Sequence, residues 1–272
     1  MIKALFFDLD GTLLDSQRRI VRTSTEALEQ CRSRGIKLFI ATARPPLLDR
    51  MLSWDAATFS LFSGGVYYNG GCIILNQHKE YQPVADAVLK SVVSEVQKYE
   101  TINIALQLEG EKHVFRLPLA EKDYTSWGVD AQSILGLEQA YEYKTIKVLL
   151  FQGNLIDSIL PIEENLITTV EDICCGRAQF YLTDKGKCIQ IMGLGINKVK
   201  GIEAIRASVG VEKNEVAVFG DDRNDIEMLS HYMHSVAMGN AGDEVKQAAK
   251  YVTMSNDDNG IAHAIRNILK LI

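Results

Sequence analysis

The stretch Ile-Lys-Ala-Leu-Phe-Phe-Asp-Leu-Asp-Gly-Thr, residues 2–12, decides the fold. Its first half is a short, mostly apolar run, which is typical of a strand buried on both faces of a parallel sheet. The run stops at two carboxylates, Asp8 and Asp10. In open parallel sheets, ligands bind outside the carboxyl ends of the strands. The sequence therefore predicts a buried strand with two acidic side chains at the edge of the sheet where ligands bind.

The residues that follow predict a βαβ unit. A helix is expected between Ser16, which can cap its start, and Gly35, where a helix commonly stops. A second apolar run, residues 38–41, then ends in polar residues that begin with Thr42. Strand, helix and strand in this order predict two parallel strands joined by a right-handed crossover.

The same pattern returns near the C-terminus. An apolar run ends in a cluster of carboxylates, Asp221, Asp222 and Asp225, and is followed by a helical pattern. Both ends of the chain therefore read as parts of one doubly wound, mostly parallel α/β sheet. The elements expected here are strands at 215–219, 235–237 and 251–253 and a last helix near 261–271.

The middle of the chain, residues 81–187, has a different pattern. Its strand-like runs are joined by short links such as residues 109–112, which favour hairpins and an antiparallel sheet. We expect a discontinuous α/β core of residues 1–80 and 188–272, with an α+β domain of residues 81–187 inserted into it. The expected elements of the insertion are strands at 102–108, 113–117, 146–151 and 179–182 and a helix within 84–99.

The composition excludes several classes of protein. The 272 residues are 47 % hydrophobic, which rules out a disordered chain, and the length suggests two cores. The formal net charge of −6 argues against a nucleic-acid partner, because affinity for polyphosphates comes mainly from Lys and Arg. No apolar run approaches the ~18 residues of a membrane span, so we expect no membrane partner and a cytoplasmic location. The five cysteines lack a C-x-x-C pair and predict neither a disulfide framework nor a zinc site.

The carboxylates at the two strand ends predict a metal site. If both strands are central in the sheet, the acidic side chains after residue 7 and after residue 219 converge. Ligation by carboxylate oxygens favours a hard cation, and Mg²⁺ is preferred when a phosphate supplies a further ligand. The alternative is that each Asp only caps the helix after it, which explains five such residues at two matching strand ends less well.

Four motifs resemble those of the haloacid dehalogenase-like phosphohydrolase superfamily. Residues 8–12, Asp-Leu-Asp-Gly-Thr, resemble its first motif, and residues 220–225, Gly-Asp-Asp-Arg-Asn-Asp, resemble its last. Thr42 matches the second motif, although Ala43 stands where the family commonly has Gly. Lys198 matches the third motif, and the resemblance implies an α/β core in which these four segments meet.

Two further comparisons refine this resemblance. The usual Lys-Gly of the third motif occurs at Lys200-Gly201, but the customary spacing before Gly210 and Gly220 selects Lys198. The segments 238–241 and 252–262 resemble the Cof-type branch, the sugar-phosphatase-like subclass IIB. The insertion lies between the second and third motifs, where the family carries a cap that closes over the nucleophile, excludes water and contacts the substrate.

The resemblance also implies roles for individual residues. Asp8 would attack phosphorus and form an aspartyl-phosphate, and Asp10 would serve as the general acid and base. Asp8 and Asp221 would bind Mg²⁺ together with the backbone carbonyl of Asp10. Asp225 and Asn224 would support the metal, directly or through water. Thr42 and Lys198 would bind the oxygens of the phosphoryl group as it is transferred.

Two more residues have an alternative interpretation. Arg44 is available to bind a substrate phosphate or hydroxyl, but an Arg at a helix start is just as often solvated. Asn69 resembles a family position that ends in Asn-Gly and would contact the substrate. The alternative for Asn69-Gly70 is a type I′ hairpin turn.

The sequence as a whole predicts a Mg²⁺-dependent phosphomonoester hydrolase that acts on a small phosphorylated metabolite, with a sugar phosphate as the expected class. A phosphotransferase or mutase that uses the same intermediate is an alternative. A non-catalytic phosphate-binding regulator is a weaker alternative, because it leaves Asp10 without a task. The physiological substrate and the choice between monomer and homodimer are not predicted.

Overall fold

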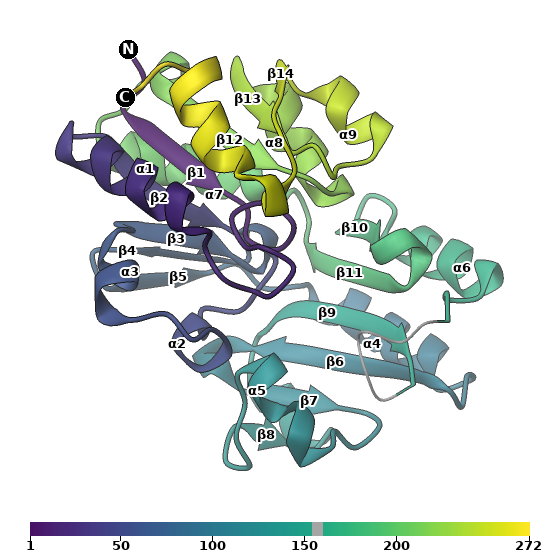
Figure 1. The fold of residues 1–272 in the computed structure, drawn as a ribbon. Coiled ribbons are helices and arrows are strands. Elements are labelled where there is room, and N and C mark those ends of the chain that lie inside the picture. Colours follow the sequence, from purple (N-terminus) through teal and green to yellow (C-terminus); the bar gives the residue numbers. More distant parts are fainter. Residues whose placement is uncertain (154–159) are drawn as a thin grey trace. The chain divides into compact units, whose positions relative to one another are not determined.

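The computed structural model describes residues 1–153 and 160–272. These residues form two compact units. The first comprises Met1–Ala43, Leu52–Glu80 and Asn197–Ile272, and the second comprises Arg44–Met51 and Tyr81–Ile196. The first unit is thus assembled from three separate segments of the chain (Figure 1). None of the helices in the described part of the chain combines the length and apolar character of a membrane span.

The first unit is built on an eight-stranded sheet. The strands from β14 to β3 are parallel to their neighbours, and β4 runs antiparallel to β3. The predicted doubly wound, mostly parallel sheet is therefore confirmed. In spatial order the strands are β14 (Tyr251–Val252), β13 (His234–Ala237), β12 (Val216–Gly220), β1 (Ala4–Phe7), β2 (Lys37–Ala41), β3 (Gly64–Tyr67), β4 (Cys72–Leu75) and β5 (His78–Tyr81).

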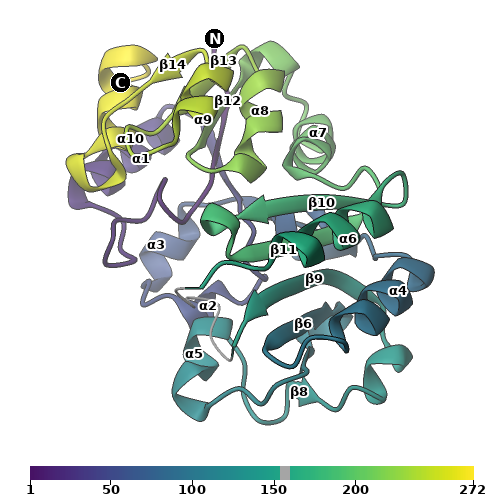
Figure 2. The ribbon, with the colours of Figure 1, turned by 90° about the vertical axis from the view of Figure 1, so that its right-hand side faces the viewer.

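Helices cover both faces of this sheet (Figure 2). Phe6 stacks on Phe39 on one face, and Phe7 stacks on Phe219 on the other, each with ring centroids 4.7 Å apart. Helices α7 and α8 bury their apolar side chains against the face of Phe6, while α1 and α10 contact each other on the opposite side. The helices are α1 (Arg22–Ser33), α3 (Ala56–Ser60), α7 (Lys198–Ser208), α8 (Ile226–His231), α9 (Asp243–Ala248) and α10 (Gly260–His263), which continues as a π-helical turn over Ala264–Ile268.

Helix α1 begins later than the sequence predicts. Asp15 accepts hydrogen bonds from the backbone N–H groups of Gln17 and Arg19, at 2.9 and 2.8 Å, and so folds the chain into a tight turn before the helix. The backbone N–H of Ser16 donates to Asp257 at 2.8 Å. The expectation that Ser16 caps the helix is therefore wrong, because the neighbouring Asp15 offers the backbone a competing set of acceptors.

The second unit contains a six-stranded sheet of the predicted α+β type. Most neighbouring strands are antiparallel, and β7 and β8 are parallel. Helices α4 (Asp86–Val96) and α6 (Glu164–Cys174) bury apolar side chains against one face. Two short helices, α2 (Leu48–Met51) and α5 (Tyr124–Trp127), contact each other. The strands in spatial order are β10 (Ala178–Thr183), β11 (Cys188–Gly193), β9 (Thr145–Gln152), β6 (Ile102–Leu108), β7 (His113–Phe115) and β8 (Ile134–Leu135).

The limits of the two units differ from the expected domain limits in two places. Residues 188–196 were expected in the core, but β11 pairs with β9 and β10 and so belongs to the second sheet. Residues 44–51 also belong to the second unit, where α2 contacts α5. Neither difference is visible in the sequence pattern, because an apolar run does not reveal which sheet it joins.

Candidate active site

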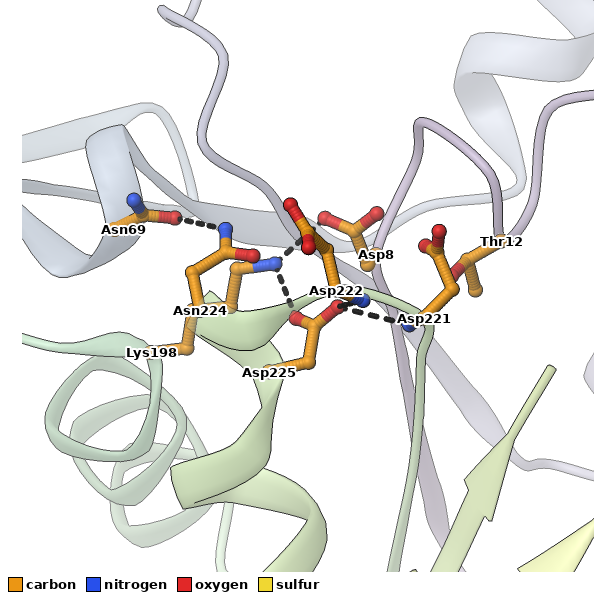
Figure 3. A network of polar contacts seen from close by, with 8 residues as sticks. All are labelled: Asp8, Thr12, Asn69, Lys198, Asp221, Asp222, Asn224 and Asp225. Atoms are coloured by element: carbon orange, nitrogen blue, oxygen red, sulfur yellow. Dashed lines mark hydrogen bonds and ion pairs between the residues drawn. The ribbon is translucent and has the colours of Figure 1, made fainter. Parts of the chain in front are cut away.

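The candidate site lies at the carboxyl ends of the central strands of the first unit. Strands β1 and β12 are parallel neighbours, with Phe7 opposite Phe219, so the residues that follow each strand leave the sheet at the same edge. Asp8 follows β1 directly, and Asp221 follows β12. Oxygens of Asp8, Asp221 and Asp225 all lie within 4.8 Å of one another. The expected convergence of the two acidic clusters is thus present (Figure 3).

A buried lysine joins two of these carboxylates. The Lys198 ammonium lies 2.6 Å from Asp8 Oδ1 and 2.6 Å from Asp225 Oδ1, and its side chain is only 1 % exposed. Lys198 is the first residue of α7, and the side chain of Asn197 caps that helix by accepting the N–H of Lys200 at 2.9 Å. A helix cap therefore fixes the backbone from which the lysine projects into the site.

Asp225 connects the lysine to the loop after β12. Its Oδ2 accepts the backbone N–H groups of Asp221 and Asp222, at 3.0 and 3.2 Å. Its Oδ1 faces Lys198, and the side chain is fully buried. Both carboxylate oxygens of Asp225 therefore accept hydrogen bonds from the protein. The support of a metal by Asp225 stays a prediction.

Asp221 is held by the loop that follows β1. The Thr12 hydroxyl donates to Asp221 Oδ1 at 2.7 Å. A side chain at Gly11 would place its Cβ 2.2 Å from Asp221 Oδ2, and Gly11 has a φ of +79°. The Asn240 amide donates to the carbonyl of Gly11 at 2.8 Å. The first and last motifs are therefore joined by the hydrogen bond from Thr12 to Asp221 and by a close approach at Gly11 that only glycine permits.

Backbone amides of the loop from Asp10 to Thr12 were expected to form a small anion nest, but no role was predicted for the side chain of Thr12 or for Asn240. Thr12 belongs to the first motif, so its position directly after Gly11 could have indicated that its side chain lies at the site. Asn240 lies in the segment 238–241, and the resemblance of this segment to the Cof-type branch implied no role for it. Its contact with Gly11 joins residues far apart in the sequence, and no local pattern reveals such a contact.

The electrostatics of the cluster favour a cation. Burial raises the pKa of Asp8 above its usual range, and the nearby Asp225 carboxylate adds to this effect while Lys198 opposes it. Burial also raises the pKa of Asp221, and the charges of Asp8 and Asp225 raise it further. The two carboxylates overcome the effect of burial on Lys198 and raise its pKa. The ammonium contacts two of the three carboxylates, Asp8 and Asp225, so a bound divalent cation would stabilise the ionised forms of the whole cluster.

The remaining predicted residues have different surroundings. Asp10 is exposed, and its backbone makes a bridge with Leu14. Thr42 is buried directly after β2, where its backbone N–H donates to the carbonyl of Val66 at 2.8 Å. Arg44 belongs to the second unit.

Asn69 and Asn224 are joined to each other. The Asn224 amide donates to Asn69 Oδ1 at 3.0 Å, and both side chains are buried (Figure 3). Tyr67 pairs with Cys72, so a four-residue loop joins β3 and β4. β3 and β4 therefore form a hairpin, but its loop is longer than the two-residue type I′ turn given as the alternative for Asn69-Gly70.

The fold and this site define a class of protein. The family model of the haloacid dehalogenase-like hydrolases matches residues 5–265, and the chain belongs to that family. It is therefore an enzyme of a hydrolase family.

Individual relatives match along almost their whole length. The chain is 27 % identical to the 5-amino-6-(5-phospho-D-ribitylamino)uracil phosphatase YbjI of Escherichia coli, over 99 % of this chain and 97 % of that protein. It is 24 % identical to the Bacillus subtilis phosphatase YcsE of the same description, over 98 % and 95 % of the two chains. Among solved structures, the subclass IIB sugar phosphatase BT4131 is 27 % identical, with a TM-score of 0.83 over 99 % of this chain and all of that one.

Proposed function

We propose that this protein is a Mg²⁺-dependent phosphatase that hydrolyses small phosphorylated metabolites, with sugar phosphates as the preferred class, through an aspartyl-phosphate on Asp8. The observation that carries the proposal is the cluster of Asp8, Asp221 and Asp225, two of whose members, Asp8 and Asp225, are buried and contact the Lys198 ammonium. The relatives named above, which are phosphatases of a phosphoribityl compound and of sugars, support the substrate class.

In the first half of the reaction, Asp8 is the nucleophile and Asp10 the acid. A carboxylate oxygen of Asp8 forms a bond to phosphorus while the ester P–O bond breaks. Asp10 donates its proton to the departing alkoxide. Its side chain lies two residues beyond the nucleophile and is exposed, whereas the carboxylate of Asp225 is buried and hydrogen-bonded on both oxygens.

In the second half, Asp10 accepts a proton from water as the water oxygen attacks the phosphoryl group. The bond between phosphorus and Asp8 then breaks, which releases inorganic phosphate and restores both carboxyl groups to their starting states. Lys198 and Thr42 bind phosphoryl oxygens in both halves, and the ammonium stabilises the charge that the oxygens carry in the transition state.

The donor set fits a magnesium ion. Asp8 and Asp221 would hold it with the backbone carbonyl of Asp10, and Asp225 and Asn224 would support it. Carboxylate oxygens are the ligands that Mg²⁺ prefers. When bound, the ion reduces the repulsion between the anionic nucleophile and the anionic phosphate. We assign substrate choice to side chains of the second unit, which holds none of the three clustered carboxylates.

The test is release of inorganic phosphate from a panel of phosphorylated metabolites, with and without Mg²⁺. Asp8→Asn should abolish turnover, and Asp10→Asn should lower it by about 10²–10⁴-fold, because the general acid is lost while the backbone is unchanged. Asp258→Asn, at an exposed position, is the matched control and should keep full activity. Unchanged turnover in Asp8→Asn, or full activity in EDTA, would overturn the proposal. Transfer of phosphate to an added alcohol in preference to water would identify a phosphotransferase.

A further inference from the structure

The loop between β3 and β4 has an unusual backbone. Tyr68, Asn69 and Gly70 are three consecutive residues with positive φ, at +52°, +54° and +105°. All three are buried. Residues other than glycine rarely adopt a positive φ, and such a backbone conformation persists only where the surrounding structure holds it. Such strained backbone occurs most often at sites of function.

This loop contacts three segments that carry predicted site residues. The backbone N–H of Asn69 donates to the carbonyl of Thr42 at 3.0 Å. Its side-chain oxygen accepts the Asn224 amide at 3.0 Å. Gly70 lies against the backbone of Asn197, where an added Cβ would stand 2.2 Å from the carbonyl oxygen. The loop thus touches the end of β2, the start of α7 and the turn after β12.

The contact at Asn197 determines where Lys198 stands. Lys198 follows Asn197 directly, and its ammonium must reach Asp8 and Asp225 at 2.6 Å each. A shift at the start of α7 would lengthen both of these contacts. On the other side of the loop, the hydrogen bond from Asn224 restrains the turn that also carries Asp225.

We infer that the Tyr68–Gly70 loop is a positioning device for this site, and that Asn69 acts through Asn224 instead of binding the substrate. The inference rests on the proposed phosphatase activity for its kinetic readout. Because the Asn69 oxygen is engaged by Asn224, removal of Asn69 affects the reacting groups and leaves substrate affinity nearly unchanged.

The first experiment measures kcat and KM for Asn69→Gly, Asn224→Ala and the double variant. Glycine tolerates the positive φ, so Asn69→Gly removes the amide and spares the backbone. We expect kcat to fall about 10- to 100-fold with KM within about twofold, because small displacements of reacting groups have effects of this size. In the Asn224→Ala background, Asn69→Gly should lower kcat by less than about twofold further. A raised KM with unchanged kcat, or effects of the two substitutions that multiply, would overturn the inference.

A glycine pair tests the contact with Asn197. Gly70→Ala should lower kcat, since its Cβ displaces the start of α7. Gly35→Ala is the matched control, because Gly35 also has a positive φ, +81°, but no atom lies within 4 Å of its added Cβ. Full activity in a folded Gly70→Ala protein would contradict the inference. If circular dichroism shows that Gly70→Ala does not fold, the Asn69 variants decide the question.

Binding of orthovanadate in the presence of Mg²⁺ separates this inference from the proposed function. Vanadate resembles the phosphoryl group in the transition state of its transfer. The dissociation constant of vanadate therefore reports how well the site is organised, without any turnover. Asn69→Gly should weaken vanadate binding by the same factor by which it lowers kcat, and unchanged binding would overturn the inference. A wild-type protein that binds vanadate but hydrolyses no phosphate ester would contradict the proposed function alone.

Discussion

Asp225 is the residue on which the geometry of the candidate site most depends. Its buried carboxylate accepts two backbone N–H groups and contacts the Lys198 ammonium. The loop after β12 and the start of α7 are therefore held together by one side chain. Removing one partner from a buried ion pair is costly, because the other charge is left without compensation.

Asp225→Asn should lower both stability and activity. The amide has the same shape but no charge, so Lys198 keeps only Asp8 as a counter-charge. We expect a loss of about 3–5 kcal/mol in the free energy of unfolding, measured by urea titration. Phosphate release should fall by about 10²-fold or more, because the lysine is displaced. A loss below about 1 kcal/mol, similar to that of the exposed control Asp258→Asn, would show that Asp225 does not organise the site.

At this scale, the motifs predicted which side chains meet but not how they are held. Asp8, Lys198, Asp221 and Asp225 were identified from the strand ends and motif order, and the structure brings them together. The hydrogen bond from Thr12 and the pairing of Asn69 with Asn224 were not predicted. Such contacts depend on the approach of loops that are distant in the sequence, and residue type alone does not indicate which loops meet. The role of each residue stays a prediction.

Helix α7 is the element that carries the lysine, and it packs unusually close to β3. A Cβ on Gly201 would lie 2.5 Å and 2.8 Å from the two Cγ atoms of Val66. Valine cannot easily rotate away, because its branched Cβ restricts χ1. The glycine therefore permits the close packing of helix on sheet.

Gly201→Ala should destabilise the protein. In an ordinary helix interior, replacing glycine by alanine raises the free energy of unfolding by about 1 kcal/mol, because alanine has the higher helix propensity. Here we expect a loss of about 1–3 kcal/mol, since overpacking against Val66 outweighs propensity. The measurement is urea unfolding in the wild-type and the Val66→Ala backgrounds, and the cost should be smaller in the second, where the obstructing methyl groups are absent. An increase in stability, or equal costs in the two backgrounds, would contradict the prediction.

At the scale of elements, periodicity predicted the strands better than the helix ends. The expected strand at 215–219 is β12 (Val216–Gly220), and that at 146–151 is β9 (Thr145–Gln152). The start of α1 was predicted too early, at Ser16, because Asp15 binds the backbone in a turn that competes with the helix. Local hydrogen bonding of this kind leaves little trace in the hydrophobic pattern.

At the scale of the whole molecule, the sequence predicted the doubly wound sheet and the inserted α+β pattern, while the limits of the two units were less predictable. The fold class followed from apolar runs at both ends of the chain, which pair as β1 and β12. The membership of residues 44–51 and 188–196 in the second unit depends on tertiary pairing, for which the sequence carries no local signal.

The second unit should lose stability in acid because of His113. Burial, with a smaller contribution from the Arg50 charge, lowers the pKa of His113 from an ordinary value of 6.5 to about 4, although a hydrogen bond with the backbone of Glu111 opposes this shift. Between these values the unfolded chain binds a proton that the folded chain does not, so stability falls as the pH falls from about 6.5 to about 4. The free energy of unfolding that is lost over this pH range reaches about 3 kcal/mol.

His113→Phe should remove this dependence. The ring is accommodated beside Phe115 and Trp127, whose centroids lie 6.0 and 6.4 Å from that of His113. Urea unfolding followed by Trp127 fluorescence in a Trp54→Phe background, at about pH 7 and about pH 4.5, measures the effect on the second unit. Equal acid sensitivity with and without the His113→Phe substitution would show that another group is responsible.

The division of the first unit into three segments has a consequence for biosynthesis. Strand β1, which is followed by Asp8, is synthesised long before its neighbour β12. The segment 81–196 is complete before β12 exists, and domains generally fold as units once their segments are available. A nascent chain therefore carries Asp8 without Lys198, Asp221 or Asp225 to hold it while the whole of the segment 81–196 is synthesised. The proposed site is assembled only after β12 and the turn that follows it have been synthesised and have joined β1.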